Sequence, residues 1–243
     1  MTLEEIAKKM CAKGKGVLAA DESTGTMDKR LKSVDVECTK KNRLTFRQAL
    51  FSSEAMKNYI GGVILFDETI KQKTSLGLTI PELIIKNGSI PGIKVDMGAK
   101  PLAGSSEETV TEGLDGLRDR LKEYYKLGAR FTKWRAVYKI GDKYPSTQSI
   151  KSNAHALARY AALVQETQMV PIVEPEVLMD GNHDIEKCYK VTTDILNECY
   201  NELAIHKVDL SGTVLKPNMI IHGSKCVNKA SSNEIAKKTL DCI

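Results

Sequence analysis

The chain has 243 residues, of which 42% are hydrophobic, 28% are charged and 5% are aromatic. This composition is typical of a globular protein with a large apolar core, in one large domain or two small ones. The formal net charge of +5 is mild, and no segment is rich in both basic and aromatic residues, which argues against nucleic acid as a partner. A small anionic metabolite is a ligand that fits this mild positive charge as well as nucleic acid does.

Membrane segments, disulfides and metal sites lack their usual sequence signals. No N-terminal signal peptide is visible, and no apolar run approaches the roughly 20 residues that span a bilayer, so we expect a cytosolic protein without a membrane partner. The six cysteines show no Cys-x-x-Cys spacing, which favours reduced thiols. The four histidines form no His-x-His or His-x-x-x-His pair. We therefore expect no zinc or iron mechanism, no metal ligands at the active site and no cofactor.

Apolar strand-like runs alternate with helical patterns along the chain. A capping box of Thr2 and Glu5 predicts a first helix that runs to about Lys13. The predicted strands cover residues 17–20, 61–66, 91–97, 130–137, 169–176 and 212–220. The other predicted helices cover about 39–51, 105–124, 150–164, 185–203 and 231–243.

Six strand-then-helix units, without a hairpin signal between paired strands, indicate a parallel α/β protein. We favour a TIM (β/α)8 barrel, of which six β/α units are present, over an open doubly wound sheet. The reason is that Gly14-Lys15-Gly16 precedes a strand, whereas a glycine-rich phosphate loop follows one. We expect residues 1–243 to form a single domain of this barrel type, incomplete at its C-terminal end.

Charged residues lie within or just after the apolar strands, where solvated side chains are not expected. Lys216 lies in the middle of the run at 212–220, and Pro217 places it where that strand ends, because proline cannot donate to a sheet. Alternation puts Lys133 and Arg135 on one face of a strand and Trp134 on the other. At the mouth of a barrel, six charged residues would gather: Asp21, Lys94, Lys133, Glu174, Glu176 and Lys216.

Lys216 has two interpretations. Taken alone, it is a strand-end lysine that reaches into solvent. Among the converging charges it is a desolvated amine whose proton affinity is lowered by the two other lysines, and such an amine is a nucleophile toward carbonyl groups. We prefer the second interpretation because charges of alternating sign can satisfy one another at the mouth.

Six ordered segments resemble class I fructose-1,6-bisphosphate aldolases, and the resemblance spans nearly the whole sequence. The segments are Gly14–Gly25, Gly61–Phe66, Gly92–Asp96, Lys133–Arg135, Val173–Glu176 and Leu215–Met219. The resemblance implies a metal-independent glycolytic and gluconeogenic lyase that reversibly cleaves fructose 1,6-bisphosphate to dihydroxyacetone phosphate and glyceraldehyde 3-phosphate. It also implies a phosphorylated sugar as substrate, a cytoplasmic location and a homotetramer.

The resemblance further implies roles for individual residues. Lys216 would form the Schiff base and Glu174 would be the main acid/base, while Asp21 and Lys133 would assist at the carbon being cleaved. Glu176 is a further catalytic candidate at the same mouth. The residues that would hold the substrate are Ser23 and Thr26, at the 6-phosphate, and Lys29, Arg30, Lys94 and Arg135. In the alternative interpretation these residues have no role in binding: Ser23 only caps a helix, and Arg30 and Arg135 are surface residues.

The sequence departs from the family in two places. Ser211 stands where the family usually has Glu, and the family has two further β/α units that build its 1-phosphate site. We therefore expect the physiological protein to continue beyond Ile243, a gap between the Lys216 and Asp21 strands, and weak bisphosphate binding by this chain. Two alternatives stay open: another Schiff-base lyase, such as a transaldolase or a deoxyribose-phosphate aldolase, and a non-catalytic scaffold or partner-binding fragment.

Overall fold

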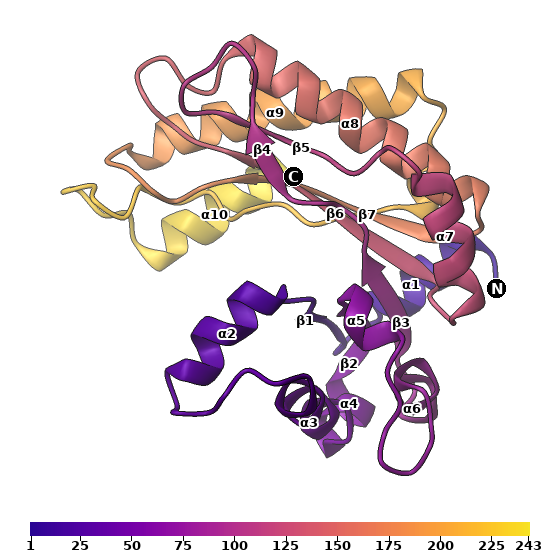
Figure 1. Ribbon diagram of the computed structural model, residues 1–243. Helices are drawn as coiled ribbons and strands as arrows, with labels where there is room; N and C mark the ends of the chain where they lie inside the picture. Colours follow the sequence, from indigo (N-terminus) through magenta and orange to yellow (C-terminus); the bar gives the residue numbers. More distant parts are fainter.

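A curved sheet of six parallel strands forms the centre of the computed structural model, which describes residues 1–243 (Figure 1). In spatial order the strands are β1 (Gly16–Ala20), β2 (Ile60–Leu65), β3 (Ile90–Lys94), β6 (Phe131–Tyr138), β7 (Val170–Val177) and β8 (Val214–Leu215). The predicted parallel arrangement of six units is confirmed. β1 and β8 are the edges of the sheet, so it is open between the strands that lead to Asp21 and Lys216, as predicted.

Most of the helices cover the outer face of the sheet, whereas the first helix packs against apolar residues of the inner face. The helices are α1 (Leu3–Met10), α2 (Thr24–Lys32), α3 (Lys40–Phe51), α4 (Glu54–Tyr59), α5 (Asp67–Ile70), α6 (Ile80–Lys86), α7 (Leu117–Lys126), α8 (Thr147–Glu166), α9 (Ile185–Ile205), the 3-10 helix η1 (Leu210–Gly212) and α10 (Ser232–Cys242). The long helices α8 and α9 lie side by side and pack on β7 (Figure 1). None of the helices has both the length and the apolar character needed to cross a membrane.

Helix α1 begins with the predicted capping box and lies against the sheet. The amide of Thr2 donates to Glu5 Oε2 at 2.8 Å, and the amide of Glu5 donates to Thr2 Oγ1 at 3.2 Å. The helix ends at Met10, earlier than the predicted Lys13. A Cβ atom on Gly61 would lie 2.3 Å from the carbonyl oxygen of Met10, so only glycine allows β2 to pass this close to the helix.

The predicted helix over 105–124 is wrong in its first half. Thr109–Thr111 form β5, which pairs antiparallel with β4 (Ala99–Pro101), and the helix begins only at Leu117. The β-branched residues Thr109, Val110 and Thr111 suit a strand. Gly113 and Gly116 have φ of 130° and 65°, values that are incompatible with a right-handed helix, so α7 cannot begin before Leu117. Thr111 Oγ1 donates to the carbonyl of Arg135 at 2.7 Å, which ties this hairpin to β6.

Two strand predictions extend too far. β3 ends at Lys94, although the apolar run was predicted to continue as strand to residue 97. The run at 212–220 is strand only at Val214 and Leu215. Pro217 has no amide hydrogen for the ladder, so the strand cannot continue past Lys216. The predicted strand-end position of Lys216 is therefore confirmed.

The inner face of the sheet changes from apolar to charged along the strands. On β6 the buried Phe131 is followed on the same face by Lys133, and on β7 the buried Ile172 is followed by Glu174. Trp134 lies on the outer face, in the core beneath the helices, as the alternation predicts. The apolar layer fills the amino end of the curved sheet and leaves the charged layer at its carboxyl end, where barrel enzymes keep their active sites.

Candidate active site

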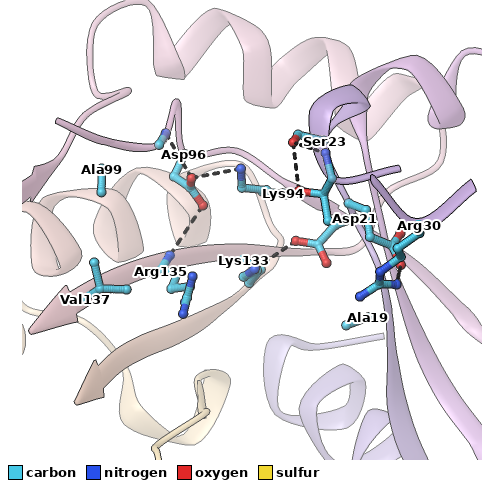
Figure 2. A pocket seen from close by; sticks show the side chains of 13 residues that line it. Ala19, Asp21, Ser23, Arg30, Lys94, Asp96, Ala99, Lys133, Arg135 and Val137 are labelled. Carbon is cyan, nitrogen blue, oxygen red and sulfur yellow. Dashed lines mark hydrogen bonds and ion pairs between the residues drawn. The ribbon is translucent and has the colours of Figure 1, made fainter. Parts of the chain in front are cut away.

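A polar cavity of about 290 Å³ opens at the carboxyl ends of β1, β3 and β6 (Figure 2). Only three of its thirteen lining residues are hydrophobic. The charged and hydroxyl residues that line it are Asp21, Glu22, Ser23, Thr26, Arg30, Lys94, Asp96, Lys133 and Arg135. A cavity with this many cations and hydroxyl groups suits an anionic, hydroxylated ligand.

Four side chains of alternating charge form a continuous row beside this cavity. Lys133 Nζ donates to Asp21 Oδ2 at 2.8 Å and lies 3.3 Å from Glu174 Oε2. Figure 2 shows Lys133 and Asp21 pointing toward each other. Glu174 Oε1 in turn accepts a hydrogen bond from Lys216 Nζ. The row therefore joins residues from β1, β6, β7 and the end of β8, although they are far apart in sequence.

Glu174 is the buried member that links the two amines. Its side chain is 3% exposed, and its Oε2 atom has an ion-pair partner in Lys133 but no hydrogen bond. It follows Ile172 on the inner face of β7, where Ile172 pairs in register with Val214 of β8. A carboxylate held between two amines, with one oxygen free of hydrogen bonds, is placed to move protons.

Lys216 is more exposed than the sequence predicted. Its backbone amide donates to the carbonyl of Val173 at 2.9 Å, which extends the pairing of β8 by one residue and brings the side chain beside Glu174. The side chain is nevertheless 47% exposed, because β8 is an edge strand. The predicted desolvation of Lys216 is therefore wrong. The structure nevertheless places its amine in contact with the buried carboxylate of Glu174.

Lys133 is the buried lysine of the site and is held as a cation. Burial alone would lower the pKa of Lys133, but attraction to Asp21 and Glu174 and the hydrogen bond to Asp21 outweigh it, so the pKa is raised above its usual 10.5. A permanently charged ammonium is a poor nucleophile but a good stabiliser of negative charge. The two lysines therefore have different chemistry.

We expect Lys133→Met to destabilise the protein by about 3–5 kcal/mol at neutral pH, because it leaves the largely buried Asp21 without its ion-pair partner and Glu174 with Lys216 alone. Since the folded pKa is raised, the contribution of Lys133 is complete below the ordinary value of 10.5 and is lost as the pH rises through the raised value. Denaturant unfolding of both proteins from about pH 7 to 11 measures the difference. A difference that vanishes already near pH 8 would contradict this account.

A second group of charges lines the other side of the cavity. Arg135 Nε donates to Glu176 Oε2 at 2.5 Å, and Lys94 Nζ lies 3.2 Å from Asp96 Oδ1. Burial would lower the pKa of Arg135, but the hydrogen bond and attraction to Glu176 raise it overall. Asp96 was not among the predicted site residues. Asp96 lies two residues after Lys94, on the same face of the strand predicted over residues 91–97, and this spacing is the sequence signal that could have identified it.

The start of α2 forms the hydroxyl-rich end of the cavity. Ser23 caps this helix, with its Oγ accepting from the amide of Thr26 at 3.4 Å, so it is both a cap and a cavity residue. Arg30 lies one helical turn after Thr26 in α2. It also lines the cavity and donates to the carboxylate of Glu22. A helix N-terminus with hydroxyls and an arginine is suited to phosphate. Lys29 is exposed and is not brought to the cavity.

Comparison with known proteins places this site in a family. Residues 2–243 match the family model of glycolytic fructose-bisphosphate aldolase class I. The chain is 54% identical, over 99% of its length and 72% of the relative's, to a probable fructose-bisphosphate aldolase class 1 from Xylella fastidiosa. It is 51% identical, over 99% of its length and 67% of the relative's, to fructose-bisphosphate aldolase C-B from Danio rerio.

A solved structure agrees with these sequence matches. A crystal structure of fructose-bisphosphate aldolase from Plasmodium falciparum, in complex with TRAP and a small-molecule inhibitor, superposes with a TM-score of 0.97 at 43% identity. The match covers 99% of this chain and 70% of that one. The predicted TIM-barrel class is thereby confirmed, with six β/α units of the barrel in this chain. The chain belongs to the class I fructose-bisphosphate aldolase family.

Proposed function

We propose that this chain cleaves fructose 1,6-bisphosphate reversibly to dihydroxyacetone phosphate and glyceraldehyde 3-phosphate, through a Schiff base on Lys216. Family membership supports the reaction. The observation that supports the residue assignment is the contact of the Lys216 amine with the buried Glu174, which also faces the cation of Lys133. Among the lysines of the site, Lys216 has the most exposed side chain, at 47%, against 21% for Lys94 and 9% for Lys133.

The reaction begins with proton transfer from Lys216 to Glu174. The neutral amine adds to the C2 carbonyl of the open-chain ketose and a C–N bond forms; Glu174 then returns its proton to the former carbonyl oxygen, which leaves as water, and Glu174 is again a carboxylate. The product is an iminium ion. When Glu174 removes the proton from the C4 hydroxyl, the C3–C4 bond breaks and its electron pair moves into the iminium, which becomes an enamine. Glyceraldehyde 3-phosphate is released first.

The second half returns the enzyme to its starting state. The enamine is protonated at C3, and water then hydrolyses the iminium to release dihydroxyacetone phosphate and the Lys216 amine. Lys133 stabilises negative charge that develops on the reacting oxygens, and Asp21 holds the Lys133 ammonium in position at 2.8 Å. The iminium accepts the electrons released by C–C cleavage, so this sequence of steps uses no metal ion.

The polar cavity beside the row of four charges, in which four cations face three carboxylates, would hold the substrate. Ser23, Thr26 and Arg30 at the start of α2 form the proposed 6-phosphate subsite. Lys94 is paired with Asp96, and Arg135 is paired with Glu176. These two basic residues would contact the hydroxyl groups and the rest of the sugar phosphate. We keep Lys29 out of this subsite because it does not line the cavity.

A coupled cleavage assay with a substrate panel tests the proposed function. We expect cleavage of fructose 1,6-bisphosphate or fructose 1-phosphate and no turnover of deoxyribose 5-phosphate or of transaldolase substrates. Activity confined to one of the latter would favour another Schiff-base lyase. Folded protein that cleaves none of them, with no adduct at Lys216, would favour a partner-binding role.

Chelation gives an independent expectation for the same assay. We expect dialysis against EDTA to leave kcat unchanged, because the iminium of the proposed mechanism supplies the electron sink that a metal ion supplies in other lyases. The measurement is the rate of fructose 1,6-bisphosphate cleavage before and after dialysis, with zinc added back as a control. Loss of activity that zinc restores would contradict the Schiff-base mechanism.

We also propose a cytoplasmic homotetramer. Two relatives from Arabidopsis thaliana, at 53% and 52% identity, are named as cytosolic fructose-bisphosphate aldolases, which supports the location. The tetramer rests on the family resemblance alone. Multi-angle light scattering of the purified chain tests it, and a stable monomer over a wide concentration range would contradict it.

A further inference from the structure

A second cluster of ligand-type side chains lies away from the active site, between α8 and α9. His155 projects from α8, while Glu202 lies in the last turn of α9 and His206, four residues later, is the residue that caps the end of this helix. The two helices pack side by side on the outer face of the sheet (Figure 1). The active-site charges lie instead at the carboxyl ends of the strands. The packing of the two helices therefore brings together histidines that are 51 positions apart in the sequence.

The contacts within the cluster centre on the carboxylate. Glu202 Oε2 lies 3.1 Å from His155 Nδ1 and 3.5 Å from His206 Nδ1. The two imidazole rings meet edge to face with centroids 5.0 Å apart. One donor atom from each residue lies within 4.8 Å of the other two. In a tetrahedral zinc site with bonds of about 2.0–2.1 Å, donor atoms are roughly 3.4 Å apart, so side-chain rotations would have to bring donor atoms that lie up to 4.8 Å apart to that spacing.

We propose that His155, Glu202 and His206 form a binding site for a divalent transition metal, with Zn²⁺ as the best-suited ion. Two imidazoles with one carboxylate favour zinc over Mg²⁺ and Ca²⁺, which prefer all-oxygen sites. Water completes the coordination on the open side, because the His155 side chain is 51% exposed.

The surroundings of His206 fit a metal ligand. Its Nδ1 donates to the backbone carbonyl of Glu202 at 2.9 Å, which leaves Nε2 of the neutral ring with its lone pair. Histidine ligands in metal sites commonly donate their other ring nitrogen to such an acceptor. The groove beside His206 also contains Arg118, Asp119 and Arg159, and Arg118 is paired with Glu166 at 2.7 Å.

A bound ion would join α8 to α9 and stabilise the fold without taking part in the proposed reaction. Isothermal titration of the full chain with ZnCl₂ near pH 7.5, in a Cys11→Ser background that removes the exposed thiol, should show one site per chain. Zinc at a hundredfold excess over its Kd should raise the Tm by about 5–10 °C. His155→Ala, His206→Ala and Glu202→Gln should each weaken binding by at least about tenfold.

The matched control is Glu186→Gln, which removes an exposed carboxylate from the other end of α9. This variant should keep the zinc affinity and the Tm shift of the parent protein. All variants should keep fructose 1,6-bisphosphate cleavage. Folding is checked by the Tm without zinc, because a variant that melts normally but loses the zinc shift has lost the site alone. Zinc binding that is unchanged in the His155→Ala/His206→Ala double variant, or no binding by the parent, would overturn the proposal.

Discussion

Replacement of Lys216 by methionine should reduce kcat for fructose 1,6-bisphosphate cleavage by at least about four orders of magnitude. Methionine keeps most of the side-chain length but has no amine, so neither the C–N bond nor the iminium can form. The fold should survive, because the Lys216 side chain is 47% exposed at the edge of the sheet. Unfolding and cleavage are measured on the same preparation.

The informative control for this variant is Lys133→Met at the other amine of the row. Both substitutions should slow cleavage, since Lys133 is proposed to stabilise developing charge. They should differ in stability, because only Lys133 is buried between two carboxylates. A Lys216→Met protein that retained more than about one hundredth of the parent kcat would contradict its role as nucleophile.

Substitution of Glu174 by glutamine should slow turnover by about two to four orders of magnitude, which is the usual contribution of a positioned acid/base group. The amide keeps the shape of the pocket but cannot accept the Lys216 proton or the proton of the C4 hydroxyl. KM should change little, because the proposed phosphate contacts come from α2 and are not altered. Steady-state kinetics at several pH values measure both parameters.

Glu176→Gln is the matched comparison one layer further along β7. Glu176 pairs with Arg135 and does not contact Lys216, so its removal should act mainly on KM through the arginine. If Glu174→Gln changed only KM and Glu176→Gln changed kcat, the acid/base assignment would pass to Glu176. If instead Asp21→Asn lowered kcat while Glu174→Gln changed only KM, the acid/base assignment would pass to Asp21.

The charged layer of the site could be predicted because it depends on short-range rules. Strand alternation places Lys133 and Glu174 on the inner face of β6 and β7, and parallel pairing aligns the strand ends. Pro217 fixed the end of the Lys216 strand for an equally local reason. Residue roles such as the Schiff base came from the resemblance, because charge and position alone do not distinguish one lysine from another.

Other features depended on contacts that the sequence does not display. The spacing of Val110, Leu114 and Leu117 fits a helix, yet the two glycines with positive φ and the pairing of β5 with β4 decide otherwise. A helix after Ser23 was considered only as the alternative to a substrate contact, and its bounds were not predicted, so the sequence did not show that Lys29 lies outside the cavity that Ser23, Thr26 and Arg30 line.

Exposure and the histidine cluster also required the tertiary structure. The desolvation predicted for Lys216 presumes neighbours on both sides of β8, and β8 is an edge of the sheet. The histidines show no ligand spacing in sequence, since His155 and His206 meet only through the packing of α8 on α9. Sequence periodicity predicts which face of a helix is buried but not which helix will cover it.

Reductive trapping tests the central assignment most directly. The chain is incubated with dihydroxyacetone phosphate, reduced with sodium borohydride, digested and analysed by mass spectrometry, because reduction converts the iminium to a stable secondary amine. We predict one adduct per chain, on the peptide that contains Lys216, and no adduct in Lys216→Met. An adduct on Lys133, or active protein that yields no adduct at Lys216, would contradict the account.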